Sequence, residues 1–170
     1  MLRGFLIHAG TGICLLFMST ACRMSPATFD SNRLQCQRNL RSIENAVKTF
    51  PYDHDGQRPR TLDDALSNLG FDDAEKAARI LRCPGMVGAS TNGDLASRTG
   101  YYYVDWSEWF GPTNTAPASY PLIYDRYLRN HAGRGVNIVS VDGTISWDEG
   151  ARALHDFVAK HPEYKLPLPN

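Results

Sequence analysis

The side chains best suited to chemistry gather between residues 125 and 147. Asp125, His131 and Asp142 bring two carboxylates and an imidazole into one short stretch. Such groups can bind a cation. They can also have purely structural roles, in which His131 braces a loop by hydrogen-bonding to backbone carbonyls and Asp142 bonds within its own turn. The residue types leave both uses open.

The other polar residues do not predict a hydrolytic active site. Ser140 alternates with the apolar residues of a predicted strand, and the chain has no Gly-x-Ser-x-Gly motif. Asp105, Glu108 and Asp125 are carboxylates of the type that a glycosidase needs, but only their type supports that role. A hydrolase is therefore the weakest of the functions considered, and we expect no enzyme and no catalytic residue.

Aromatic residues are concentrated between residues 101 and 120, where Trp106, Trp109 and Tyr120 follow the run Tyr101-Tyr102-Tyr103. Most of these rings should pack in the core and its loops. Exposed members would form a patch able to bind a glycan or a peptide. A surface binding module that uses residues 101–120 is therefore the alternative function.

The N-terminal segment has the layout of a secretory signal. Arg3 precedes an apolar stretch that ends in Ser19-Thr20-Ala21, and Cys22 follows directly. A cysteine at this place resembles the lipidated residue of a bacterial lipoprotein, although Ser19 stands where leucine is usual. An uncleaved membrane anchor is the alternative. In either case we expect an envelope protein that is held to a membrane and faces the periplasm or the exterior.

Charge points away from nucleic acid. The 18 basic and 18 acidic residues balance, and no basic run is present.

If Cys22 carries lipid, Cys36 and Cys83 remain as an even pair, which predicts a disulfide in an oxidising compartment. The bridge would close a loop of about 47 residues, worth on the order of 4 kcal/mol. Two buried free thiols are the alternative; metal binding is not expected, because neither cysteine has a nearby Cys or His partner.

The elements that must position these residues begin with one long helix. Apolar residues spaced by four and three predict a buried helical face: Cys36, Leu40, Ile43, Val47 and Phe50. The opposite, solvent-facing side would carry Arg38, Arg41, Glu44, Asn45 and Lys48. Asp30 or Ser31 is expected to cap this helix, and Pro51 to end it. Short helices should follow, one capped by Thr61 with Asp64 and one over residues 73–80.

A small antiparallel sheet is expected in the second half. Strands are predicted over residues 101–106 and 121–125, followed by a hairpin within 131–147. Asp142-Gly143 should form its turn, with positive φ at both residues. Asp148 would then cap a last helix, and the tail would be extended. Helices that precede a meander argue for an α+β fold, with the long helix packed on the sheet.

Three blocks of sequence resemble the globular domain of bacterial pseudopilins, the pilin-like proteins of type II secretion and related filaments. The first joins Cys36–Lys48 to the Gly56-Gln57-Arg58-Pro59 turn, and the second is Leu81-Arg82-Cys83-Pro84. The third comprises residues 101–104, 121–125 and 131–147, whose last part has a His, a Gly-rich turn and an Asp-Gly hairpin. Together the blocks cover roughly residues 34–147.

The resemblance implies a pilin-like α+β domain. Major pseudopilins can bind calcium in a loop near the sheet, and by resemblance Asp105 or Asp125 would be the residues to contribute here. No residue pattern fixes such ligands, so no cofactor is expected and calcium is kept as the alternative. The start of the chain departs from the family, because it has no prepilin-peptidase motif. We therefore expect a signal peptide (1–21), a lipidated N-terminus and tether (22–33) and one pseudopilin-like domain (34–170). The expected function is that of a non-catalytic lipoprotein that contacts other envelope proteins.

Overall fold

The computed structural model describes residues 26–67, 74–85, 99–111 and 116–170. The proposed signal peptide and Cys22 lie outside this part of the chain. Within it, no helix is both long enough and apolar enough to span a bilayer.

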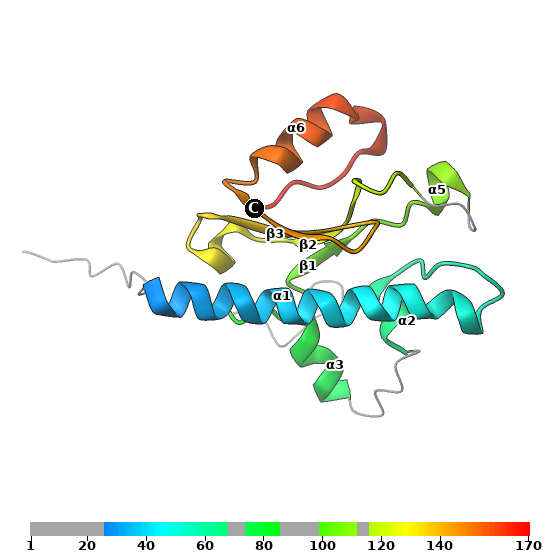
Figure 1. The fold of residues 1–170 in the computed structure, drawn as a ribbon, viewed down its shortest axis with the longest axis horizontal. Coiled ribbons are helices and arrows are strands. Elements are labelled where there is room, and N and C mark those ends of the chain that lie inside the picture. Colours follow the sequence, from blue (N-terminus) through cyan, green and yellow to red (C-terminus); the bar gives the residue numbers. More distant parts are fainter. Residues whose placement is uncertain (1–25, 68–73, 86–98, 112–115) are drawn as a thin grey trace, which may run out of the picture.

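The fold is α+β, as the sequence predicts. A long helix, α1 (Pro26–Thr49), lies along one face of a four-stranded sheet, and α6 (Arg152–Lys160) lies on the other face (Figure 1). The strands are β1 (Tyr101–Tyr103), β2 (Pro121–Asp125), β3 (Gly135–Ser140) and β4 (Ile145–Glu149). Each strand pairs antiparallel with the next, in the order β1-β2-β3-β4.

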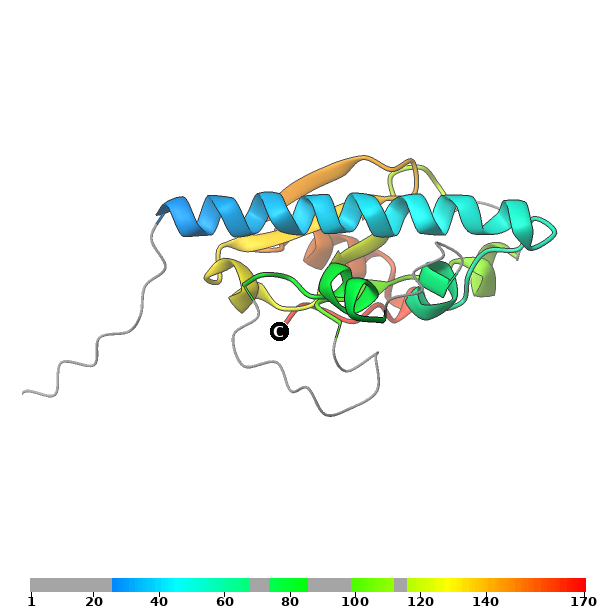
Figure 2. The ribbon, with the colours of Figure 1, turned by 90° about the horizontal axis from the view of Figure 1, so that it is seen from below.

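Short helices complete the domain. They are α2 (Leu62–Ser67), α3 (Ala74–Leu81), α5 (Ser107–Phe110) and three 3₁₀ turns, η1 (Phe50–Asp53), η2 (Leu128–His131) and η3 (Pro162–Tyr164). Both α2 and α3 pack against α1 (Figure 2). Because α1 therefore contacts the sheet and both of these helices, it is the central element of the core.

Helix α1 forms where its apolar spacing predicts, but it begins earlier than expected. Cys36, Leu40 and Ile43 are fully buried on its inner face. The helix starts at Pro26, a residue that suits the first helical turn because it needs no free N–H there. Asp30 and Ser31 therefore lie inside the helix, and the prediction that one of them caps it is wrong. Most of the predicted tether is helical.

Glu44 is buried, although the helical pattern places it on the solvent-facing side of α1. Its side chain is only 2% exposed. The turn between β3 and β4 packs against this part of α1, and Arg41 and Lys48 both pair with the buried carboxylate. Arg41 also donates to the carbonyl of Gly143 (2.9 Å), and Lys48 donates to that of Asp142 (3.2 Å). These contacts fix the hairpin turn on α1.

The hairpin turn differs in type from the prediction. Gly143 has a positive φ of 88°, but Asp142 does not. The Gly143 N–H donates to Ser140 O (2.8 Å), and the Ser140 N–H donates to Thr144 O (2.9 Å). This is the pattern of a three-residue loop with glycine in the left-handed region, not of a two-residue turn. The Asp142 side chain accepts from the Thr144 N–H (2.8 Å).

Two predicted helix caps are present. Thr61 and Asp64 exchange side-chain and backbone hydrogen bonds at the start of α2 (3.0 and 3.1 Å). Asp148 accepts from the N–H groups of Ala153 (3.1 Å) and Leu154 (2.9 Å), in the first turn of α6. Asp148 does this from strand β4, so a single carboxylate joins the sheet to the helix that covers it.

Candidate functional site: a buried polar cluster beside a disulfide

The predicted disulfide between Cys36 and Cys83 is present. Cys36 lies on α1, and Cys83 follows the end of α3 by two residues. Their Cα atoms are 5.4 Å apart, and both residues are fully buried. The bridge therefore ties the segment after α3 to the central helix, in the middle of the core.

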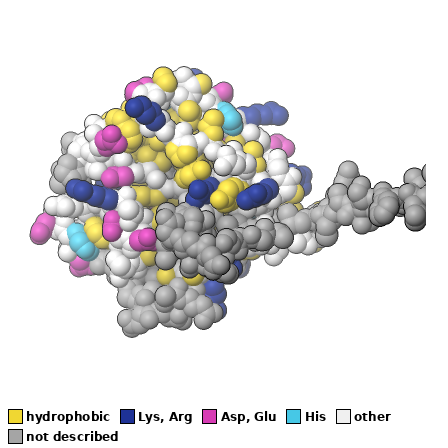
Figure 3. Space-filling model, turned by 180° about the vertical axis from the view of Figure 1, so that it is seen from behind, with side chains coloured by type: hydrophobic (Ala, Val, Ile, Leu, Met, Phe, Trp, Pro, Cys, Tyr) yellow, Lys and Arg dark blue, Asp and Glu magenta, His cyan; other side chains and the backbone are white. Residues whose placement is uncertain are grey.

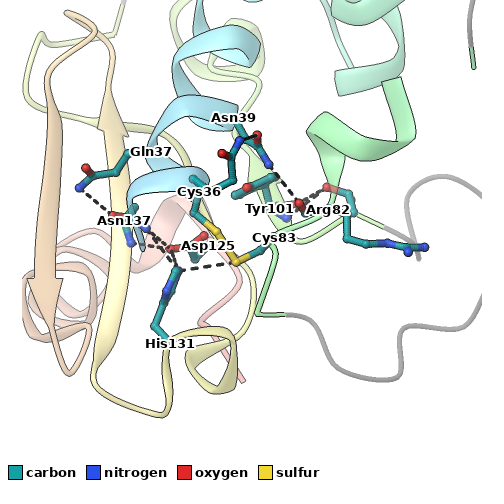
Figure 4. The surroundings of a disulfide bond; sticks show 11 residues. Cys36, Gln37, Asn39, Arg82, Cys83, Tyr101, Asp125, His131 and Asn137 are labelled. Atoms are coloured by element: carbon teal, nitrogen blue, oxygen red, sulfur yellow. Dashed lines mark hydrogen bonds and ion pairs between the residues drawn. A yellow bond between two sulfur atoms is a disulfide. The ribbon is translucent and has the colours of Figure 1, made fainter. Parts of the chain in front are cut away.

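A charged and polar group lies directly beside this bridge. It consists of Asp125, His131 and Asn137, each 0% exposed, which we call the buried polar cluster (Figure 4). Asp125 is the last residue of β2, His131 ends η2, and Asn137 lies in β3. Sheet pairing between β2 and β3 brings the first and third together, and the connecting turn η2 folds His131 back onto them.

One carboxylate oxygen organises the cluster. Asp125 Oδ2 accepts from the Asn137 N–H (2.6 Å) and from Asn137 Nδ2 (2.9 Å), and it lies 2.9 Å from His131 Nε2. With its proton on Nε2, His131 donates the third bond. Burial of a carboxylate is costly unless such donors compensate for lost water, so these bonds account for Asp125 in the core.

The imidazole of His131 is held between aromatic rings and sulfur. Phe29 and Trp147 both meet the ring edge to face, at centroid distances of 6.4 and 5.4 Å. On the remaining side, His131 Nε2 lies 3.8 Å from the Sγ atom of Cys83. The ring is thus fixed in a single orientation, with Nε2 directed at both Asp125 and the disulfide.

Side chains of α1 hold the surroundings of the cluster. Gln37 donates to Asn137 Oδ1 (3.1 Å), and Asn39 donates to the carbonyl of Arg82 (3.0 Å), next to Cys83 (Figure 4). Burial, together with the charge of Asp125, raises the pKa of Tyr101 far above its usual value, so its phenol stays protonated. The polar groups thus connect α1, the sheet and the segment after α3.

Some polar atoms of this region are not satisfied. Among the described residues, Asp125 Oδ1, His131 Nδ1 and the side-chain amide atoms of Asn130 are buried and have no hydrogen-bond partner. Buried polar atoms usually find partners, and leaving one unpaired costs about 1–3 kcal/mol. Hydrogen bonding within the cluster therefore satisfies the carboxylate of Asp125 and the imidazole of His131 only in part.

The three residues predicted to bind a cation, Asp125, His131 and Asp142, do not all lie together in the structure. Asp125 and His131 are in contact, as their joint assignment requires. Asp142 is exposed at the hairpin turn, where the hydrogen bond from the Thr144 N–H lowers the pKa of its carboxyl group. Asp105, the other residue suggested for calcium, accepts from the Ser107 N–H (2.9 Å) at the start of α5. Within the described ranges, the group that could hold a metal joins Asp125 to His131, Cys36 and Cys83 instead.

The suggested aromatic patch is mostly internal. Trp106 is 2% exposed, and its indole N–H donates to Pro121 O (3.0 Å), so it offers no surface to a ligand in this conformation. Trp109 and Tyr120 are partly buried against Trp106, at ring-centroid distances of 5.6 and 5.2 Å. Trp106 belongs to the hydrophobic core, and these rings pack against that core together with Phe110, Phe157 and Tyr164. The arrangement favours packing over binding.

Sequence reasoning missed Asn137 and the closeness of the cysteines to His131. Asn137 interrupts the apolar run Val136–Val139, and a polar residue inside a buried strand is a signal of an internal hydrogen-bond partner. The meeting of the cysteines with Asp125 and His131 has no such local signal, because Cys36 and Cys83 are far in the chain from each other and from that pair.

Comparison with known proteins adds no relative. No protein-family model matches the chain, and the searches of characterised proteins and of solved structures found no match.

Proposed function

We propose that this chain is a non-catalytic lipoprotein of the cell envelope, whose pseudopilin-like domain acts through contacts with other envelope proteins. The observation that supports this most is the burial of its reactive groups. Asp125, His131 and Asn137 are each 0% exposed, and aromatic rings and a disulfide surround the imidazole. A substrate would have no path to these side chains without an opening of the core.

The architecture also supports the proposed resemblance to pseudopilins. A long helix on an antiparallel meander is the arrangement that the pseudopilin-like blocks imply. A structural disulfide also suits an oxidising compartment outside the cytoplasm.

The position of α1 suggests how an anchored domain would be presented. Cys22 precedes the first residue of α1, Pro26, by only a few positions. A 24-residue helix is about 36 Å long. A lipid on Cys22 would therefore hold one end of α1 near the membrane, and the other end would lie at most about 36 Å further out. That distant end carries Tyr52, whose ring is 87% exposed, and the β3–β4 turn.

The surface of the described residues is consistent with protein contacts. Basic and acidic side chains are interspersed on the face seen in Figure 3, and apolar side chains lie exposed between them. Interfaces of transient partners commonly have this mixed character.

Metabolic labelling with a palmitate analogue tests the anchor on which this proposal depends. The full chain should incorporate label and fractionate with membranes, and Cys22→Ala should abolish both. Cys14→Ala is the matched control, since it removes a cysteine of the same segment and should leave the label in place. Absence of label from the wild type, or label that survives Cys22→Ala, would overturn the proposal.

A further inference from the structure

Four potential metal ligands converge inside the core. Cys36 Sγ, Cys83 Sγ, a ring nitrogen of His131 and a carboxylate oxygen of Asp125 all lie within 4.8 Å of one another (Figure 4). All four residues are 0% exposed. They come from four separate segments: α1, the residues after α3, the end of β2 and the turn η2. From the sequence we expected no metal binding, because neither cysteine has a Cys or His close to it in the chain. In the folded protein, His131 and Asp125 lie close to both cysteines in space.

The distances suit a tetrahedral zinc site. Zn²⁺ binds sulfur at about 2.3 Å and nitrogen or oxygen at about 2.0–2.2 Å, so neighbouring ligand atoms lie roughly 3.3–3.8 Å apart. His131 Nε2 is already 3.8 Å from Cys83 Sγ, which matches this spacing. It lies 2.9 Å from Asp125 Oδ2, so the hydrogen bond between these two atoms would have to open for the metal to enter. The two sulfur atoms, which are bonded to each other, would also have to move apart.

We propose that the reduced form of this protein binds one zinc ion through Cys36, Cys83, His131 and Asp125. The disulfide and the zinc complex are then alternative states of one site, and each crosslinks α1 to the segment after α3. Loss of the disulfide would thus not leave the centre of the core without a crosslink.

The chemistry of the exchange balances with a dithiol as reductant. The dithiol reduces the Cys36–Cys83 bond to two thiols and is itself oxidised to a disulfide. Zn²⁺ then displaces the two thiol protons, which pass to water. The proton on His131 Nε2 moves to Nδ1, so that Nε2 can donate its lone pair to the metal.

Groups around the four ligands are placed as supports of a metal site. Asn137 donates twice to Asp125 Oδ2, while Asp125 Oδ1 has no partner among the described residues. The carboxylate is thus fixed in orientation and keeps one oxygen available. Phe29 and Trp147 hold the imidazole ring edge to face. Such outer contacts orient ligands and raise metal affinity.

Metal titration of the purified full chain in both redox states tests the proposal. The protein is reduced with a phosphine under anoxic conditions and freed of reductant. It is then titrated with Co²⁺, whose absorption reports thiolate bonds and tetrahedral geometry, and with Zn²⁺ against a chelating dye. The reduced protein should bind one ion with both spectral signatures. The oxidised protein has the same residues but no thiolates, and it should bind none.

Single-residue variants then test whether all four residues bind the zinc ion or the two cysteines alone. His131→Asn and Asp125→Asn should each weaken zinc binding by the reduced protein at least about tenfold and alter the Co²⁺ spectrum. His155→Asn, which changes an exposed histidine of α6, is the matched control and should change neither. Equal affinity in all three variants would overturn the proposal, because two thiolates alone would then hold the metal.

If reduction of the disulfide unfolds the chain, circular dichroism still tests the proposal. Zinc should then restore the far-ultraviolet spectrum of the reduced wild type, since metal binding and folding are coupled in sites of this kind. A reduced wild type that neither binds Co²⁺ nor regains structure with zinc would also overturn the proposal.

Discussion

The buried carboxylate of Glu44 lies directly against Gly143 at the tip of the β3–β4 hairpin. A Cβ atom on Gly143 would stand 2.5 Å from Glu44 Oε1 and would overlap the ammonium group of Lys48. Gly143 also has a positive φ of 88°. The absence of a side chain at this residue therefore serves two purposes, the turn conformation and the close approach of the hairpin to α1.

Gly143→Ala should destabilise the domain by about 3 kcal/mol. Left-handed backbone accounts for about 1–2 kcal/mol of this, and displacement of a buried ion pair accounts for the rest. Gly133→Ala is the matched control, because Gly133 has a φ of 73° and open space where its Cβ would lie. Urea unfolding of both variants should give a clearly smaller loss for Gly133→Ala. Equal losses would mean that the contact with Glu44 contributes nothing.

Local patterns predicted most of the fold. The apolar spacing of α1, the short apolar run of β2 and the cap residues Thr61 and Asp148 all lie where short-range rules place them. The errors arose where tertiary contacts decide. Helical periodicity assigns Glu44 to solvent, and only the packing of the hairpin on α1 buries it. The Asp-Gly pair predicts a turn, but its type depends on the length of the loop between the paired strands.

The candidate site was predictable only in part. Asp125 and His131 are close in sequence, and residue type alone suggested that they act together. Their meeting with the disulfide depends on how α1, α3 and the sheet pack, which is long-range information that no motif carries. Asp142 was joined to them by sequence proximity, but antiparallel pairing carries it to the far end of the hairpin.

Asp148→Ala should loosen α6 and cost about 2 kcal/mol of stability. Its carboxylate accepts two backbone N–H groups in the first turn of α6, and a lost helix cap costs roughly 1–2 kcal/mol. Hydrogen exchange at Ala153 and Leu154 should speed up more than exchange in α1. Glu149→Ala changes the next, exposed residue of the same strand and should have little effect. Similar exchange in both variants would contradict the capping role.

Cys36→Ala with Cys83→Ala should lower stability by about 4 kcal/mol, because the bridge restricts a long loop of the unfolded chain. Denaturation should be followed in the presence of a chelator, so that no metal replaces the bridge. Peptide mass analysis of the non-reduced wild type should recover the two cysteines as one linked species. Recovery of two unlinked thiols would refute the bridge itself.

The domain should unfold in base through its buried tyrosines. Burial raises the pKa values of Tyr101, Tyr103 and Tyr124 well above 10, their value in the unfolded chain. Because the folded-state pKa values are the higher ones, the folded state retains these protons more strongly. The stability they contribute is complete below about pH 10 and is lost as the pH rises further.

Tyrosinate absorbance and circular dichroism, recorded together above pH 10, would test this. These phenols should ionise in one cooperative step that coincides with loss of structure. Tyr124→Phe removes a phenol that donates to Pro167 O (2.7 Å) and should reduce the amplitude of that step. Tyr52→Phe changes a residue that is 87% exposed and should leave the step unchanged. Gradual ionisation of all tyrosines in a still-folded protein would show that burial does not hold these protons.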